Sequence, residues 1–279
     1  MKNQRIYIEK KQVPDINGIF PRGFFYGDGV FETMRWKKSS PVFLQKHIER
    51  ITHGALILKM PAPDGKKIVE EINECVEKSG FSDCAVKVCL VSGGSFAPFF
   101  SVPDDFQTVI SISEITDNPA DISLKIVFNG YSRSSSPVAG IKSLNYLGNV
   151  VAMREARESG FDDALFSSAD GCVSETTCRN IFWGEKNELF TPSTDCGILP
   201  GITRGVLMDI AARNGFSVSE SRLNPGDLAQ AGFVFATNSV SGITPVEKIS
   251  LQDLTLNFST SVDNSYKQLT ALLLKAFQW

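Results

Sequence analysis

Residues 129–146 have the sequence NGYSRSSSPVAGIKSLNY, in which a run rich in turn residues leads directly to Lys142. Gly, Ser, Asn and Pro interrupt helices and strands, and apolar segments stand on both sides of this run. We therefore expect the connection between two domains near residues 129–140. The strands and helices predicted around it indicate an α+β or α/β chain, with an N-terminal α/β domain at residues 1–117 and a C-terminal domain at residues 118–279.

Apolar periodicity predicts the elements of both domains. Alternating apolar residues predict strands, and apolar residues at helical spacing predict helices, one of which Asp64 is placed to cap. The predicted strands cover residues 5–8, 30–36, 42–43, 85–91, 108–115, 163–166, 180–183 and 233–236. The predicted helices follow His47 and Asp64 and cover residues 149–158, 203–213 and 266–277.

Composition and charge exclude several classes of protein. Hydrophobic residues make up 42% of the 279 residues, which is typical of a globular chain with a sizeable core. The net charge of -3 gives no basic footprint for nucleic acid. No apolar run approaches the roughly 20 residues of a membrane helix, and the amino terminus lacks an apolar signal core. We therefore expect a cytoplasmic protein without nucleic-acid or membrane partners.

The cysteines and histidines do not form a catalytic or metal-binding pattern. None of the six cysteines belongs to a CxxC pair, and His47 and His53 are the only histidines, so we expect no metal site. Neither histidine accompanies a nucleophile motif such as G-x-S-x-G. Demanding chemistry in this chain would therefore need an organic cofactor.

Two charged residues suit such a cofactor. Lys142 lies in the uncharged stretch GIKSLNY, and a lysine that loses solvation gives up its proton more easily and can then form an imine. Glu175 precedes a strand of large apolar residues, where its carboxylate suits the ring nitrogen of pyridoxal phosphate (PLP). A solvent-exposed lysine and a solvated turn glutamate are the alternative interpretations.

Two polar turns suit the phosphate of the same cofactor. Residues 197–204, GILPGITR, form a glycine turn that leads into a helix, whose first N–H groups and Thr203 hydroxyl would bind a phosphate. Residues 237–242, TNSVSG, follow an apolar strand and offer further donors. An ordinary capped helix and an ordinary polar loop are the alternatives.

These features occur with further motifs in a known order. Residues 26–35 have the sequence YGDGVFETMR, residues 47–50 HIER, and residues 244–246 TPV. With Lys142 and TNS at 237–239, the chain resembles the class IV aminotransferases of PLP fold type IV over nearly its whole length. The resemblance implies an α+β fold of two domains with the cofactor in the interdomain cleft, and a homodimer.

The resemblance also implies residue roles. Lys142 would be the Schiff-base lysine and proton shuttle, and Glu175 would bind the pyridine nitrogen. The remaining implied cofactor residues are Arg50 as the phosphate clamp, Ile202, Thr203, Asn238 and Ser239 as further phosphate donors, and Tyr146 beside the phenolic oxygen.

The substrate residues are less well defined because Ser92-Gly-Gly-Ser95 stands where many family members carry Arg-Gly. Arg35, Lys87, Arg133 and Arg179 are the candidates for the missing cation, and Tyr26 lies in the first motif. Ile141–Asn145 and Leu199–Arg204 resemble D-amino-acid transaminases most. We therefore predict transfer of an amino group between an amino acid, D-amino acids favoured, and a 2-oxo acid. The alternatives are 4-amino-4-deoxychorismate lyase, then branched-chain L-amino-acid transaminase, and last a binding protein without catalysis.

Overall fold

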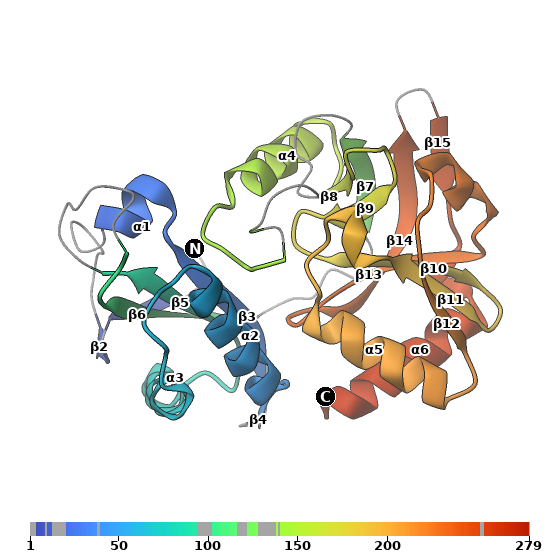
Figure 1. Cartoon of the computed structure of the whole chain (residues 1–279). Helices are drawn as coiled ribbons and strands as arrows, with labels where there is room; N and C mark the ends of the chain where they lie inside the picture. The colour runs from blue at the N-terminus through green and yellow to red at the C-terminus, as the bar shows by residue number, and fades with distance from the viewer. Residues whose placement is uncertain are drawn as a thin grey trace. The chain divides into compact units, whose positions relative to one another are not determined.

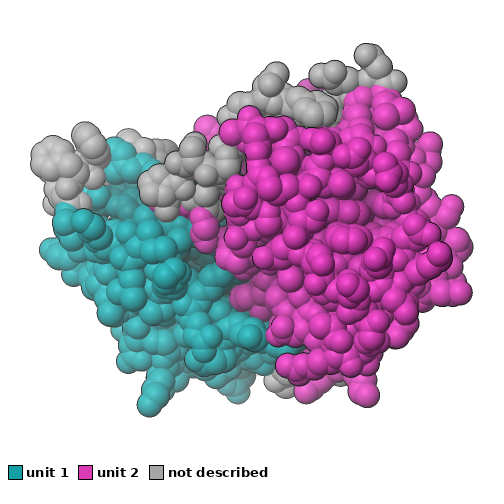
Figure 2. All heavy atoms as spheres, turned by 45° about the vertical axis from the view of Figure 1, so that its right-hand side comes forward, with its two compact units in different colours: residues 1–117, 141–145 teal, residues 118–140, 146–279 magenta. Residues whose placement is uncertain are grey.

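The computed structural model describes residues 4–8, 10–12, 21–37, 40–93, 102–115, 122–127, 138, 140–251 and 254–278. The chain divides into two compact units (Figure 2), one formed by residues 1–117 and 141–145 and the other by residues 118–140 and 146–279. Lys142 thus packs with the first unit, although its place in the sequence lies within the predicted second domain. Most of the predicted connection, and Arg133 within it, lies outside the described residues.

The described part of the first unit is built on a six-stranded antiparallel sheet with the order β2-β1-β6-β5-β3-β4 (Figure 1). The strands are β1 (Gln4–Ile8), β2 (Lys11–Gln12), β3 (Gly29–Lys37), β4 (Ser40–Pro41), β5 (Asp83–Ser92) and β6 (Phe106–Glu114). The helices are α1 (Pro21–Tyr26), α2 (Leu44–Ile57) and α3 (Gly65–Ser79).

The two faces of this sheet differ in what covers them. Successive side chains of a strand point to opposite faces, so Val30, Glu32 and Met34 share one face and Phe31 and Thr33 the other. All three side chains of the first set are buried. Helix α2 covers them, because Glu32 hydrogen-bonds to His47 of α2 and Val30 lies beside Gly54 of α2. We call this the helix-covered face, and the face that carries Phe31 and Thr33 the Phe31 face.

The second unit contains a nine-stranded mixed sheet among its described residues, with the path β12-β11-β10-β13-β14-β7-β8-β9 and β15 paired to β14. The strands are β7 (Ile122–Val127), β8 (Asp163–Ser167), β9 (Val173–Thr176), β10 (Asn180–Glu185), β11 (Glu188–Pro192), β12 (Ser217–Ser221), β13 (Phe233–Asn238), β14 (Gly242–Leu251) and β15 (Leu254–Asn257). The helices are α4 (Leu147–Glu158), α5 (Ile202–Arg213) and α6 (Asn264–Phe277), with 3-10 turns at Thr194–Cys196, Pro225–Gln230 and Thr260–Val262.

A continuous apolar core holds the second sheet. Ile181 of β10 and Val234 and Ala236 of β13 are fully buried in it, together with Val246 and Ile249 of β14. On another part of this unit, Phe182 and Phe235 stack with their ring centroids 5.2 Å apart, and Tyr266 of α6 packs on Phe235. Neighbouring apolar strands therefore fix the position of β10, whose first residues follow Glu175 closely.

Most predicted elements are confirmed, with shifted ends. Asp64 caps α3 as predicted, since its side chain accepts hydrogen bonds from the backbone N–H groups of Lys66 and Lys67. One prediction is wrong, because residues 42–43 form a turn and not a strand. The helix expected after His47 is present but already begins at Leu44. Among the residues that the structure describes, no helix is long and apolar enough to cross a membrane.

Candidate active site

Lys142 lies against the edge of β3 in the first unit. Its carbonyl oxygen accepts a 2.8 Å hydrogen bond from the Phe31 N–H, and Ser143 forms an antiparallel bridge with Val30. The Leu144 N–H donates in turn to the Gly29 carbonyl over 2.9 Å. This pairing sets Lys142 opposite Phe31, and cross-strand partners point to the same face of a sheet.

Two ammonium groups therefore lie against one aromatic ring on the Phe31 face. The Nζ atom of Lys142 lies 4.3 Å from the centre of the Phe31 ring, and the Nζ atom of Lys87 lies 4.4 Å from it. Lys87 reaches the ring from β5, where it pairs with Thr33, two residues along β3. The negative face of the ring attracts both cations, while Lys142 is half-buried and Lys87 exposed.

The opposite face of β3 carries a buried ionic cluster. Arg50 binds Glu32 through two hydrogen bonds, Nε to Oε1 at 2.6 Å and Nη2 to Oε2 at 2.7 Å, and Nδ1 of His47 lies 2.7 Å from Oε2. Burial by itself raises the pKa of Glu32, but the bonds from Arg50 and His47 outweigh it and lower that pKa to about 2. Burial lowers the pKa of His47, so its ring is neutral at pH 7 and donates Nδ1–H to Glu32.

In the second unit, Glu175 stands at the end of β9 with 6% of its surface exposed. Its Oε2 atom accepts hydrogen bonds from the Leu199 N–H at 3.0 Å and the Asn180 side chain at 3.2 Å. Asn180 also donates to the Leu199 carbonyl at 2.9 Å. These bonds hold the carboxylate against the segment that leads to α5. A side chain at Gly201 would disturb them, because its Cβ would lie 1.9 Å from the Asn180 Oδ1.

The amino-terminal end of α5 combines several donors. The cap residue Gly201 has no side chain to bond the first N–H groups, and the hydroxyls of Thr203 and Ser239 lie 3.1 Å apart. Asn238 shapes the neighbouring turn, since its side-chain oxygen accepts bonds from the N–H groups of Val240 and Ser241. Ile202 is the first residue of the helix. Uncapped N–H groups and hydroxyls of this kind suit an anion such as phosphate.

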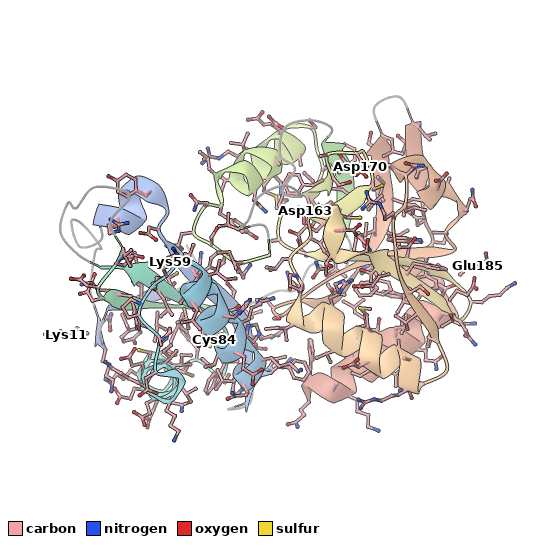
Figure 3. All side chains as sticks on the ribbon, viewed as in Figure 1. Lys11, Lys59, Cys84, Asp163, Asp170 and Glu185 are labelled. Carbon is pink, nitrogen blue, oxygen red and sulfur yellow. The ribbon has the colours of Figure 1, made fainter. Side chains whose placement is uncertain are left out.

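Tyr146 and Arg179 both form hydrogen bonds that hold the turn between β9 and β10. The Tyr146 hydroxyl donates to the Thr177 carbonyl at 3.0 Å. Arg179 donates through Nη1 to the fully buried Asp163 at 2.7 Å, and Asp163, labelled in Figure 3, also accepts the Thr177 hydroxyl. The carboxylate of Asp163 therefore anchors this turn and the Arg179 side chain together.

Arg35, a further cation predicted for the substrate, is also held in an ion pair. Arg35 is 3% exposed, and its Nε and Nη2 atoms each lie 2.6 Å from an oxygen of Asp83. Arg35 stays a predicted substrate residue, although this partly buried pair already compensates its charge. Tyr26 ends α1 with its ring largely exposed, 5.8 Å from the Arg22 guanidinium, and Arg22 in turn pairs with Asp28.

These donors fit PLP. The cofactor needs an amine, a carboxylate and a set of phosphate donors, which Lys142, Glu175 and the beginning of α5 provide in their respective units. No described cluster of His, Cys, Asp or Glu has the geometry of a metal site. The sequence patterns did not identify Phe31, Asn180 or Asp163 as site residues. Glu32 was also not identified, although a charged residue on the apolar side of a strand indicates a buried partner.

Comparisons with known proteins identify the family and several relatives of this chain. The family model described as amino-transferase class IV matches residues 29–249. The aminodeoxychorismate lyase of Bacillus subtilis is 30% identical over 250 residues, 87% of this chain and 84% of that protein. A D-alanine aminotransferase of Listeria monocytogenes is 28% identical, over 83% and 81% of the two chains. A structure titled putative 4-amino-4-deoxychorismate lyase from Legionella pneumophila has a TM-score of 0.88 and 30% identity, and the match covers 96% and 98% of the chains.

Proposed function

Because the chain belongs to the class IV aminotransferase family, whose members are PLP-dependent enzymes of fold type IV acting on amino and keto acids, we propose that it eliminates pyruvate from 4-amino-4-deoxychorismate and leaves 4-aminobenzoate. The relative and the solved structure that support this choice carry lyase names and are each 30% identical to the chain. The motifs around Lys142 and Thr203 favoured D-amino-acid transamination, which becomes the second candidate.

One observation carries the proposal, the position of Lys87 beside Lys142 on the Phe31 ring. The substrate of the lyase is a dicarboxylate, so a cation near the reacting amine is needed to bind it. Arg35 and Arg179 are each paired with a carboxylate, whereas Lys87 forms no ion pair with any residue that the structure describes. Lys87 is therefore the cation that a substrate carboxylate would bind.

Further residues would hold the cofactor. Lys142 would bind PLP covalently through its amine, and Glu175 would accept the N–H of the pyridine ring. Thr203, Ser239 and the first N–H groups of α5, beginning with Ile202, would bind the phosphate. Once bound, PLP supplies an electron sink next to the carbon that reacts.

Arg50 would add charge at the phosphate. Glu32 binds the guanidinium through two hydrogen bonds, Nε to Oε1 and Nη2 to Oε2, and these bonds fix its orientation. Asn238 would shape the phosphate loop through its own turn, and Tyr146 would lie at the phenolic oxygen. Arg179 stays a predicted substrate residue, although Asp163 already compensates its charge. Tyr26, at the end of α1, also stays a predicted substrate residue.

Lys142 would move the proton in the proposed reaction. Its amine takes the proton from the ring carbon that bears the substrate amino group, and the bond between the neighbouring carbon and the enolpyruvyl oxygen breaks. The ring becomes aromatic, and the released enolpyruvate regains a proton as pyruvate. Lys87 binds a carboxylate throughout and holds the substrate over Lys142.

Transamination would use the same lysine, Lys142. It differs from the lyase reaction in the atom to which the proton returns. A D-alanine aminotransferase is among the relatives, and residues 141–145 and 199–204 resemble that group. In that reaction Lys142 would take the proton from the substrate carbon that bears the amino group, and bound PLP would supply the carrier for this amino group until a 2-oxo acid accepts it. The homodimer implied by the resemblance remains a prediction for either reaction.

The two reactions are separated by product analysis of the PLP-loaded enzyme. With aminodeoxychorismate, we expect the enzyme to form 4-aminobenzoate and pyruvate in equal amounts. With D-alanine and 2-oxoglutarate, we expect it to form no glutamate. Lys87→Met should raise KM for aminodeoxychorismate more than tenfold, and Lys87→Arg should restore most of the affinity. Glutamate formation from D-alanine without any 4-aminobenzoate would replace the lyase proposal with the transaminase.

A further inference from the structure

Residues 141–145, which we call the lysine segment, pack on glycines of the first unit. A Cβ atom added at Gly29 would lie 2.7 Å from the Cδ1 atom of Leu144, and one added at Gly27 would lie 2.5 Å from the Oδ1 atom of Asn145. The Asn145 side chain also donates a hydrogen bond to the Gly27 carbonyl over 3.2 Å. Both gaps are shorter than the roughly 3.5 Å of a van der Waals contact, so side chains of the lysine segment fill the space that these glycines leave open.

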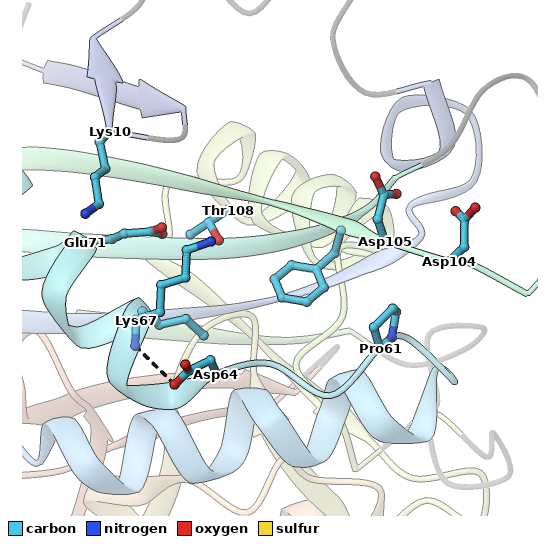
Figure 4. Close-up of a pocket in the computed structure, with 10 residues that line it drawn as sticks. Lys10, Pro61, Asp64, Lys67, Glu71, Asp104, Asp105 and Thr108 are labelled. Carbon is cyan, nitrogen blue, oxygen red and sulfur yellow. Dashed lines mark hydrogen bonds between the residues drawn. The ribbon is translucent and has the colours of Figure 1, made fainter.

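Gly54, buried in α2, is a third glycine beside the lysine segment. A Cβ atom there would lie 3.1 Å from the Cγ1 atom of Val30 and 3.8 Å from the Cβ atom of Ile141. Val30 and Ile141 are 1% and 5% exposed, so neither faces open solvent. The pocket of this unit in Figure 4, about 640 Å³ between α3 and β6, gives no room either, because neither Gly54 nor Val30 is among its described lining residues. A side chain as small as alanine at position 54 would therefore push Val30 by a few tenths of an ångström.

Val30 and its neighbour Phe31 hold Lys142 through the backbone. Val30 forms an antiparallel bridge with Ser143, and the Phe31 N–H donates to the Lys142 carbonyl over 2.8 Å. The centre of the Phe31 ring in turn lies 4.3 Å from the Nζ atom of Lys142. A push on Val30 thus reaches both the backbone and the amine of Lys142. The separation between α2 and β3, which Gly54 keeps small, therefore sets where this amine lies.

Helix propensity does not explain Gly54. A glycine inside a helix destabilises it relative to alanine, so a glycine there indicates close packing against a neighbour. We propose that Gly54 is a positioning residue for Lys142, because its missing side chain lets α2 approach β3 closely enough to hold the amine against the Phe31 ring. The inference rests on the proposed role of Lys142 as the amine that binds PLP and moves the proton.

Gly54→Ala tests the proposal in the PLP-loaded full chain. The Phe31 ring favours the positively charged form of the Lys142 nitrogen, so displacement of this nitrogen should lower the pH midpoint of the visible absorption of lysine-bound PLP by about half a unit. This readout uses no substrate and therefore does not depend on which reaction the enzyme performs. With aminodeoxychorismate, kcat should fall about tenfold and KM should change less, because proton transfer depends on the position of the amine.

Two further variants make the test specific. Gly140→Ala adds a Cβ atom next to the lysine segment where nothing lies within 4 Å, and it should titrate as the wild type does. Val30→Ala, combined with Gly54→Ala, returns the space that the new Cβ atom takes and should restore the midpoint and kcat, and Val30→Ala alone completes the cycle. Gly54→Ala should unfold near the wild-type temperature, because the better helix propensity of alanine offsets the tighter contact.

Borohydride reduction followed by peptide mapping shows which lysine of the wild type carries PLP. PLP on another lysine would overturn the proposed function and this inference with it. PLP on Lys142, with an unshifted midpoint in Gly54→Ala, would overturn this inference alone. The same holds for an equal shift in Gly140→Ala, and for a shift or a loss of folding in Gly54→Ala that Val30→Ala does not relieve.

Discussion

Replacing Glu32 by Gln tests the buried ionic cluster most directly. The glutamine keeps the shape of the side chain and resembles the protonated carboxyl, so the variant removes the charge and little else. Arg50 and His47 then lose the carboxylate that binds them at 2.6 and 2.7 Å. The guanidinium of Arg50, with 15% of its side chain exposed, is left with a weak partner.

The magnitude follows from the pKa of Glu32, which falls from 4.5 to about 2 on folding. That difference of about 2.5 units corresponds to about 3 kcal/mol of stability at pH 7. The sign follows from a depressed folded-state pKa: the contribution is complete above pH 4.5 and disappears as the pH falls toward 2. With these two pKa values, about 1.4 kcal/mol should remain at pH 3.

Urea unfolding of wild type and Glu32→Gln at pH 7, 4 and 3 measures this contribution. The difference in free energy of unfolding should shrink from about 3 kcal/mol at pH 7 to about half of that at pH 3. Glu70→Gln, at an exposed position on α3, serves as the control and should show no such pH dependence. The reasoning fails if the Glu32→Gln difference stays below 1 kcal/mol at pH 7, or if it is the same at all three pH values.

Three further substitutions test the two units separately. Gly201→Ala should lower PLP affinity at least tenfold, measured by equilibrium dialysis, because the new Cβ would lie 1.9 Å from Oδ1 of Asn180. Asp163→Asn should lower the free energy of unfolding by about 3 kcal/mol in urea, since it leaves the Arg179 charge largely buried without its carboxylate; an effect below 1 kcal/mol would contradict this. Lys142→Ala should abolish product formation and the visible absorption of lysine-bound PLP, and bound PLP with unchanged absorption would show that another amine holds it.

Local patterns were sufficient for the elements and for some of the site. The Asp64 cap, the strand through Phe31 and Glu32, and the helix that begins at the glycine turn depend on spacing within about ten residues, which the sequence displays directly. The start of α2 was misplaced because Leu44 and the residues after it carry no capping side chain, and Phe43 adopts a left-handed backbone with φ of 53°.

The sequence patterns could not predict which segments, far apart in the sequence, pair with one another. Residues 141–145 follow a run of turn residues and read as part of the second domain, yet they pair with the edge of β3, more than a hundred residues earlier. Edge pairing of this kind depends on backbone groups that any sequence offers. The same holds for Glu32, whose burial was foreseeable from its place among apolar residues but whose partners on α2 were not.

The choice among the candidate cations illustrates the same limit and its consequence for function. In the sequence, Arg35, Lys87 and Arg179 are equivalent positive charges near predicted strands. Asp83, 48 residues from Arg35, and Asp163, 16 residues from Arg179, bind two of the three in the folded chain. A cation already paired with a buried carboxylate gains little from a second one, because its charge is compensated and its geometry fixed. Lys87, held by an aromatic ring beside Lys142, is the cation that we propose for the substrate, and on that proposal specificity would depend on which cations the fold has already neutralised.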